Sequence, residues 1–388
     1  MLVQQARVGG KWIACDCLGA SIAPPVLTPA FLSEAETYYL RRLTSPGRSE
    51  HQPDCPFFRE QATNRISEVR SSDGPSDPPI GYFAVLHPAP EKLSQRPDND
   101  STDDRTRHGA TPRLARLLWR LMSLSGLNSA PPLAFEDPER GIASEFRAIA
   151  RSAGRIEIAP GIELDRAFWT HAQALHSKQA YAVLRRLEPR WPRGHAPQGF
   201  LALFASEIRG AVIVAAGAEP VTLANRVQSP SIRGNPVKGP YLVLTVVGEY
   251  PEARGYAPLR AYAQPILSGR RFLPVDSEHE RDVFRALFSL RHDFDRRGVD
   301  LAFEKPLFEI LTPLGSCRPD MILRAQHRVT GEIRHLVIEM MGSLVPEHLM
   351  AKAANHSRMR QLAPLICLFP DDVAAQRVKP MILSAIGF

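Results

Sequence analysis

The chain has 388 residues, 44% of them hydrophobic, and a formal net charge of +7, so it is longer than one hydrophobic core usually organises and several domains are expected. Its five cysteines, an odd number, disfavour a secreted disulfide framework, and the longest apolar stretch, residues 210–218, is too short to span a bilayer. No apolar segment follows Met1, and these features together predict a cytoplasmic protein that does not associate with membranes.

Two short clusters of metal-ligand residues stand in the first part of the chain. Cys15 and Cys17 form one cluster, and His51 and Cys55 form the other. Four soft or borderline ligands suit tetrahedral zinc, so residues 1–90 are predicted to form a Zn²⁺-binding module. The C-x-C spacing differs from that of a standard zinc finger, and buried free thiols are the alternative interpretation.

The same region carries a resemblance to a known group of proteins. Residues 12–17, 38–43 and 51–58 resemble an uncharacterised bacterial family carried on plasmids and integrative elements. The resemblance extends along much of the chain. It implies DNA handling in plasmid maintenance or defence, without an established activity.

The middle of the chain shows organisation but no chemical motif. Residues 91–111 are polar and poor in large apolar side chains, which predicts a flexible linker. Apolar residues at helical spacing then predict a helical segment over 112–195, with helices at 138–153 and about 164–187. Over residues 196–272, short β-rich runs separated by Gly and Pro predict a small antiparallel sheet or barrel. The runs are residues 200–205, 211–215, 220–227 and 241–247.

The basic charge is compatible with a nucleic-acid partner, because clustered Arg and Lys displace counterions from phosphates. Here the basic residues are scattered along the chain, and a solvated basic surface is the alternative interpretation. The charge alone therefore gives DNA only weak support as a partner, and the sequence identifies no protein partner.

The last domain, residues 273–388, is predicted to run helix, three strands, helix, strand, helix. Ser277 is a good N-cap for an apolar helical stripe that includes Phe284 and Leu287. Strand-like runs follow, and a turn at 329–332 predicts a hairpin. The predicted strands are residues 301–310, 317–323, 335–342 and 364–369, and the predicted helix between the last two is 346–362.

Pro319-Asp320 and Glu339 lie on two of these strands, in an order that resembles the PD-(D/E)XK nuclease superfamily. Its motif is Pro-Asp on one strand and Glu-x-Lys on the next. The resemblance implies a restriction-endonuclease-like αβββαβα domain in which Asp320 and Glu339 hold Mg²⁺ or Mn²⁺ beside a phosphodiester. Met341 stands where the family has Lys. Lys352, on the following helix, is the proposed substitute for that ammonium.

Each of these residues also has a purely structural interpretation. Glu280 could contribute to the metal site from the first helix, or it could only complete a capping box with Ser277. Asp320, after a proline, could simply start a strand from a turn. Glu339 is harder to explain structurally, because a carboxylate in an apolar strand is costly to bury without a partner or a metal.

We therefore expect a multidomain α+β protein whose favoured function is a metal-dependent nuclease acting on DNA. Two alternatives stay open. A catalytically inactive nuclease fold could serve as a DNA-binding or assembly module, which Met341 favours. Alternatively, a zinc-organised protein-interaction protein could carry the C-terminal carboxylates in a structural role.

Overall fold

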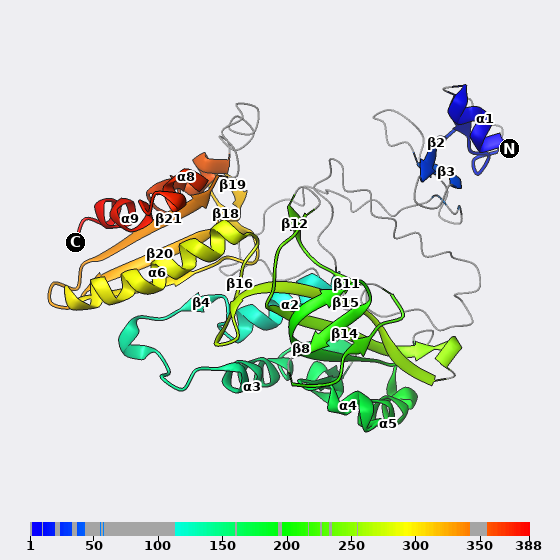
Figure 1. Cartoon of the computed structure of the whole chain (residues 1–388), viewed down its shortest axis with the longest axis horizontal. Helices are drawn as coiled ribbons and strands as arrows, with labels where there is room; N and C mark the ends of the chain where they lie inside the picture. Colours follow the sequence, from blue (N-terminus) through cyan, green and yellow to red (C-terminus); the bar gives the residue numbers. More distant parts are fainter. Residues whose placement is uncertain are drawn as a thin grey trace. The chain divides into compact units, whose positions relative to one another are not determined.

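The computed structural model describes residues 2–9, 11–19, 24–32, 37–42, 55, 57, 113–159, 161–192, 196–215, 217–225, 227–232, 235–253, 255–341 and 355–388. The chain divides into two compact units (Figure 1). The first comprises Met1–Ser71 with Arg96–Asn99, and the second comprises Ser72–Gln95 with Asp100–Phe388. The expected linker at 91–111, His51 and Lys352 lie outside the described residues.

In its described residues, the first unit has one short helix and an antiparallel sheet of order β1-β2-β3. Its elements are α1 (Leu2–Val8), β1 (Ile13–Ala14), β2 (Val26–Leu32) and β3 (Thr37–Arg42). Val26 and Leu27 of β2 are buried. Because β1 ends at Ala14, the next residue, Cys15, stands at the edge of this small sheet, and its N–H donates to the carbonyl of Pro25 at 2.7 Å.

The second unit begins with a β-rich layer covered by helices. Its sheet runs in the order β10-β9-β8-β14-β15-β11, with β7 paired to β8 and β16 paired to β15. The strands are β7 (Phe168–Trp169), β8 (Gln198–Arg209), β9 (Val212–Ala215), β10 (Val221–Thr222), β11 (Val227–Gln228), β14 (Tyr241–Tyr250), β15 (Gly255–Ser268) and β16 (Arg271–Pro274), and β12 (Ser231–Ile232) with β13 (Asn235–Pro236) form a separate hairpin.

The longest described strand, β15, is absent from the sequence prediction. Pro258 and Pro265 interrupt its pattern, and proline cannot donate to a ladder, so such a run is normally read as a loop. The sheet accommodates Pro258 at a register shift: Val246 pairs with Arg260 and Val247 pairs with Pro258, so Leu259 of β15 is the extra, bulged residue. A bulge of this kind leaves one residue unpaired and tolerates the missing N–H.

The helices are α2 (Arg113–Leu124), α3 (Ile142–Ala153), α4 (Gln173–His176) and α5 (Gln179–Leu187). The single helix predicted for 164–187 is wrong. The stretch forms a 3₁₀ turn, the short strand β7, α4 and α5 instead, and Lys178 between α4 and α5 has a φ of 59° that ends the first of them. Residues of the helical segment and of the β-rich segment share one hydrophobic core, in which Leu117 and Leu121 join Leu244.

The C-terminal part follows the predicted order with one difference: the strand predicted for 301–310 is wrong beyond Glu304, and a separate short hairpin over 310–317, absent from the prediction, follows it. Its elements are α6 (Glu278–Arg296), β17 (Val299–Glu304), β18 (Ile310–Thr312), β19 (Gly315–Cys317), β20 (Met321–His327), β21 (Ile333–Met340), β22 (Leu365–Leu368), α8 (Pro370–Ala374) and α9 (Val378–Ile386). Of the helix predicted for 346–362, residues 355–359 are described and helical.

The C-terminal sheet has the order β22-β21-β20-β17-β4, with β22 parallel to β21 and the other pairs antiparallel. Its last strand, β4 (Ser129–Ala130), comes from the segment between α2 and α3, so the middle of the chain contributes to this sheet. Helices α6 and α9 bury their apolar faces on one side of the sheet (Figure 1). Within the described residues, none of the helices is both long enough and apolar enough to cross a bilayer.

Candidate functional site

Asp320 and Glu339 face each other across two neighbouring antiparallel strands. Asp320 directly precedes β20, and Met321 at the start of β20 pairs with Ile338 of β21, so the register places Asp320 opposite Glu339. Met321 and Ile338 point into the core under α6, and alternation puts the two acidic residues on the other face. Directly opposed residues have Cβ atoms about 4.5–5.5 Å apart. The sheet therefore brings the two predicted carboxylates together.

The Asp320 carboxylate is anchored to the strand that carries Glu339. The backbone N–H of Met340 donates to Asp320 Oδ2 at 2.6 Å. A side-chain oxygen thus takes the place of a ladder carbonyl where β20 begins. Glu339 is only 4% exposed, so its carboxylate stands in a sheltered position beside this bond.

Glu280 takes part in more than a helix cap. As predicted, Ser277 Oγ accepts from the Glu280 N–H at 3.0 Å and caps α6. The Glu280 carboxylate, however, accepts from the backbone N–H of Asp276 through Oε2 and contacts the ammonium of Lys305 through Oε1. Glu280 is 2% exposed. The capping explanation therefore accounts for its backbone and not for its carboxylate.

Lys305, which the sequence interpretation missed, is the cation of this site. It follows the last residue of β17 and is 3% exposed, and its Nζ lies 2.9 Å from Asp276 Oδ2. Burial alone would lower the pKa of Lys305, but the charges of Asp276, Glu280 and Asp320 outweigh burial and raise it. For Asp276, burial favours a higher pKa, yet Lys305 and Arg318 hold its pKa below the usual value. The ammonium and the Asp276 carboxylate are both charged.

The cluster carries more negative than positive charge. The pKa of Glu280 is raised to about 8, chiefly because burial disfavours the carboxylate, and also because Asp276 and Asp320 repel it, while Lys305 acts in the opposite direction. Three carboxyl groups surround the Lys305 ammonium, Glu339 adds a fourth next to Asp320, and Arg318 supplies a second positive charge near Asp276. A bound divalent cation would relieve this excess.

Asn128, beside β4, fixes the backbone that carries Lys305. Its carbonyl accepts from the Lys305 N–H at 2.8 Å, and its Nδ2 donates to the Lys305 carbonyl at 2.9 Å and to Glu304 Oε1 at 3.1 Å. Two of these hydrogen bonds hold the Lys305 backbone, and the third holds the Glu304 side chain. The pairing of β4 with β17 thus positions the buried lysine.

A second polar link joins the β-rich layer to the site. Trp119 Nε1 on α2 donates to Gln264 Oε1 at 2.8 Å, and Gln264 Nε2 on β15 donates to the Val275 carbonyl at 2.9 Å and to Asp276 Oδ1 at 3.4 Å. The Arg318 guanidinium lies 5.4 Å from the centroid of the Trp119 ring. The site residues Asp276 and Arg318 are therefore held from the middle of the chain as well as from the C-terminal sheet.

The residue at the position of the family's lysine is part of the sheet core. Met341 is 3% exposed, and its N–H donates to the Leu368 carbonyl of β22 at 2.8 Å. Lys352, the proposed substitute, lies outside the described residues. Two signals could have pointed to Lys305: it is one of seven lysines in the chain, and it lies within the apolar run predicted as the strand 301–310.

The donor set suits a hard cation. Mg²⁺ is typically bound through one or two carboxylates while it keeps several waters, and the opposed Asp320 and Glu339 offer such a pair. Across the described ranges, the acidic side chains do not form a compact group of three, whereas three cysteines do. The acidic pair is therefore compatible with a hard divalent cation that keeps several of its waters.

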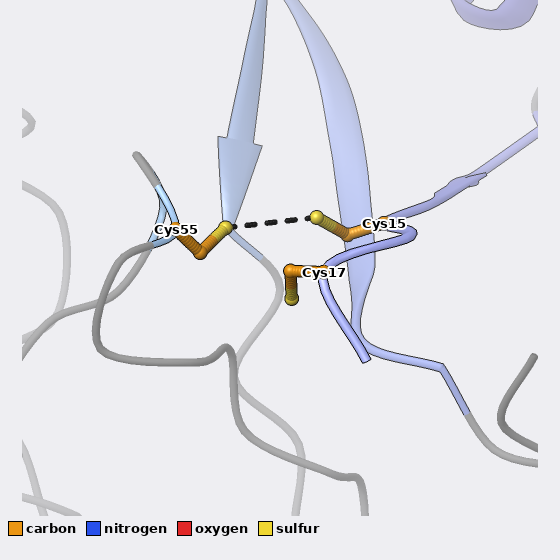
Figure 2. Close-up of side chains that lie close together, drawn as sticks. All are labelled: Cys15, Cys17 and Cys55. Carbon is orange, nitrogen blue, oxygen red and sulfur yellow. Dashed lines mark hydrogen bonds between the residues drawn. The ribbon is translucent and has the colours of Figure 1, made fainter. Parts of the chain in front are cut away.

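The three cysteines converge in the N-terminal unit. Cys15 and Cys17 come from the segment after β1, and Figure 2 shows their sulfurs gathered with that of Cys55. The sulfurs all lie within 4.8 Å of one another, and Cys15 Sγ is 3.7 Å from Cys55 Sγ. Sulfurs on one tetrahedral zinc would be about 3.8 Å apart, given Zn–S bonds of about 2.3 Å. The cluster is compatible with a metal site.

Without a bound ion, the environment of Cys15 favours the protonated thiol. Burial raises the pKa of Cys15 to about 11; side-chain hydrogen bonds to Cys17 and Cys55 add to that effect, and a backbone hydrogen bond from Cys17 opposes it. Three adjacent thiolates would repel one another without a bound cation. Zinc ligation requires thiolates, so a bound ion would have to lower the pKa of these thiols. The predicted fourth ligand, His51, lies outside the described residues.

Comparison with known proteins gives a match for the part that carries the acidic pair. Residues 276–385 match the family described as restriction endonuclease-like C-terminal domain. Residues 75–266 and 1–61 match two domains of unknown function, DUF8535 and DUF8534. Neither a search of curated proteins nor a search of solved structures gave a match. Residues 276–385, from α6 to α9, therefore form a restriction endonuclease-like domain.

Proposed function

We propose that the protein is a nuclease that cleaves DNA with Mg²⁺ or Mn²⁺. The observation that carries this proposal is the register of β20 and β21, which sets Asp320 opposite Glu339 within a restriction endonuclease-like domain. The excess negative charge around Lys305 supports it, because a divalent cation is the partner that such a cluster lacks. The basic pI of 9.3 is consistent with a phosphate-bearing substrate.

Asp320 and Glu339 would hold the metal ion, which, when bound, polarises the phosphodiester and lowers the pKa of an attacking water. The Met340 N–H fixes the orientation of Asp320. Lys305 stands close enough to Asp320 for their charges to interact, and it adds positive potential where negative charge develops during phosphoryl transfer. Asp276 and Glu280 keep that ammonium in place.

Glu280 supplies a titratable carboxyl group close to neutral pH. Its pKa of about 8 suits proton transfer, because general acids and bases act best when their pKa is near the working pH. Its burial places it behind Lys305, so we assign it a positioning role. The proton at its carboxylate would leave when a divalent cation increases the local positive charge.

We also propose that Cys15, Cys17 and Cys55 bind Zn²⁺, with His51 as the fourth ligand. A fully ligated site of this type is structural and contributes folding free energy. The mutual approach of the three sulfurs supports it. The resemblance of the N-terminal pattern to proteins of mobile elements supports a role in plasmid maintenance or defence.

A second candidate function is an inactive nuclease fold that binds DNA. Met341, buried in the sheet at the position of the family's lysine, favours it, since loss of one electrostatic donor typically slows a reaction by about 10²–10³. Lys305 favours the active nuclease over the inactive fold. It brings an ammonium to the carboxylate cluster from the end of β17, which Met341, directly after β21, cannot do.

The test is incubation of the full-length protein with supercoiled plasmid and with single-stranded DNA, in Mg²⁺, in Mn²⁺ and in EDTA. The nuclease proposal predicts nicked or linear product only with a divalent metal. Salt-dependent DNA binding with no product under any condition would instead support the inactive DNA-binding module. Absence of both would support the interaction protein.

A further inference from the structure

A pocket of about 370 Å³ lies beside the 3₁₀ turn Leu133–Phe135, away from the carboxylate site. Three arginines line it: Arg140, Arg270 and Arg271. A fourth arginine, Arg291 on α6, stands behind it, since its Nη1 lies 2.6 Å from Oε2 of the pocket residue Glu136. Four guanidinium groups from three separate segments of the second unit therefore meet at one place.

The carboxylates of this region are already engaged. Glu136 contacts both Arg271 and Arg291, and Asp137, which also lines the pocket, accepts the Glu139 N–H through Oδ1 at 2.9 Å. The remaining acidic neighbour, Glu145, is buried against Arg140. With Arg270, the four arginines outnumber these three carboxylates by one charge.

Several guanidinium donors in this cluster have no acceptor among the described residues. Arg291 is 2% exposed, and its Nε and Nη2 lack a hydrogen-bond partner, as does the buried Nη1 of Arg271. Arg270 is exposed at the rim and makes no ion pair within the described part of the chain. Burial lowers the pKa of Arg271 to about 10, assisted by the charge of Arg291. The cluster is short of negative charge.

The two buried guanidiniums are held in fixed orientations. Arg271 lies 4.3 Å and Arg291 lies 5.4 Å from the centroid of the Phe288 ring, and Glu136 joins them from the other side. A planar guanidinium fixed by an aromatic ring and a carboxylate has lost its conformational freedom before a ligand arrives. Such preorganisation lowers the cost of binding.

We propose that this pocket binds a phosphate group. A phosphate brings both the negative charge and the acceptor oxygens that the unpaired donors of Arg270 and Arg271 require, and arginine matches phosphate geometry through paired N–H donors. The chain has no glycine-rich phosphate loop, so recognition depends on side chains here. The proposal does not depend on nuclease activity.

The phosphate could belong to a nucleic acid strand or to a free nucleotide or inorganic phosphate. Glu280 and Arg291 are eleven residues apart on the buried face of α6, and this spacing corresponds to about 16 Å along the helix axis. One DNA strand, with a phosphate every 3.4 Å or so along the duplex axis, could therefore reach both places. The two sources need separate arms in the experiment.

The experiment measures phosphate binding by the full-length protein in EDTA, so that no cleavage occurs. One arm titrates inorganic phosphate and a nucleoside monophosphate by calorimetry. The other compares matched oligonucleotides with and without a 5′-phosphate by fluorescence anisotropy. The variant is Arg270→Gln, which is exposed and leaves the core intact, and the matched control is Arg147→Gln, an exposed arginine on α3 with the same charge change.

We expect Arg270→Gln to weaken phosphate binding roughly tenfold, as is typical for one charged hydrogen bond, and Arg147→Gln to leave it unchanged. Preference for the 5′-phosphorylated oligonucleotide, lost in Arg270→Gln, would assign the pocket to nucleic acid. Saturable binding of free phosphate or nucleotide without that preference would assign it to a small ligand. Either supports the proposal. No saturable binding in either arm, or equal binding by Arg270→Gln and wild type, would overturn it.

Discussion

Lys305 contacts Glu280 in the interior of the second unit, with both side chains less than 5% exposed. The two residues come from the end of β17 and the first turn of α6, and Asp276 joins them at 2.9 Å from the lysine Nζ. An isolated ammonium would be very costly to bury. The acidic residues around the candidate metal pair therefore stabilise, and are stabilised by, one lysine.

Removing the Lys305 ammonium should destabilise the protein strongly. Lys305→Met leaves Asp276 and Glu280 without their cation, and breaking a buried pair in this way typically costs about 3–5 kcal/mol. Lys379→Met is the matched control, because Lys379 is 37% exposed and lies 3.6 Å from Asp293, where such a pair contributes at most about 1 kcal/mol. Urea unfolding measures both variants.

The double variant Lys305→Met with Asp276→Asn checks the cause, because the lowered pKa of Asp276 keeps this carboxylate charged beside Lys305. If the loss comes from uncompensated negative charge, neutralising Asp276 should restore part of the free energy of unfolding. Equal destabilisation by Lys305→Met and Lys379→Met, or no recovery in the double variant, would show that Lys305 is not a structural counter-ion of this cluster.

Stability should fall as the pH rises toward 8, because of Glu280. Its pKa is raised from 4.5 to about 8 in the folded state, so between these values the folded protein holds a proton that the unfolded chain releases. The corresponding stabilisation is fully present below about pH 4.5 and is lost as the pH rises through about 8. The raised pKa of Lys305 and the lowered pKa of Asp276 act outside this window.

Glu280→Gln stays neutral at every pH and should remove this decline. Urea midpoints measured for both proteins at several pH values between about 5 and 8 give the comparison. The wild type should lose stability relative to Glu280→Gln as the pH increases. Parallel curves would mean that Glu280 ionises in the folded protein as it does in the unfolded chain.

The cysteine cluster should hold one zinc ion per chain. Cys15→Ser, Cys17→Ser or Cys55→Ser each removes a thiolate ligand and should reduce the zinc content of the purified full-length protein, measured by mass spectrometry of the metals. Cys367→Ser, in the C-terminal sheet on β22, is the control and should retain the ion. Zinc-free wild type after reconstitution with Zn²⁺, or full retention by Cys17→Ser, would count against the site.

The C-terminal fold was predictable because its signals are local. The capped stripe behind Ser277 predicts α6, and the turn around Gly331 predicts the β20–β21 hairpin, which fixes the register of Asp320 with Glu339. The middle of the chain was harder to predict. Pro258 and Pro265 conceal β15, whose long antiparallel pairing with β14 no local pattern reveals.

The lysine of the site could not be predicted for a similar reason. Lys305 and Glu280 are 25 residues apart in the sequence, and their contact depends on β17 packing beside the start of α6. Asn128, which holds the Lys305 backbone, is more distant still, at 177 residues. The sequence therefore shows which carboxylates could bind metal, whereas only the folded chain shows which cation accompanies them.

The most direct test of the proposed function is the rate of plasmid cleavage in Mg²⁺ by wild type, Asp320→Asn and Glu339→Gln. The control is Asp371→Asn, an exposed acidic residue on α8. Metal-dependent cleavage by wild type and Asp371→Asn is predicted, with a loss of at least about 10²-fold in each site variant, as for removal of one essential electrostatic group. No cleavage by wild type, or full activity in Asp320→Asn and Glu339→Gln, would contradict the proposed nuclease.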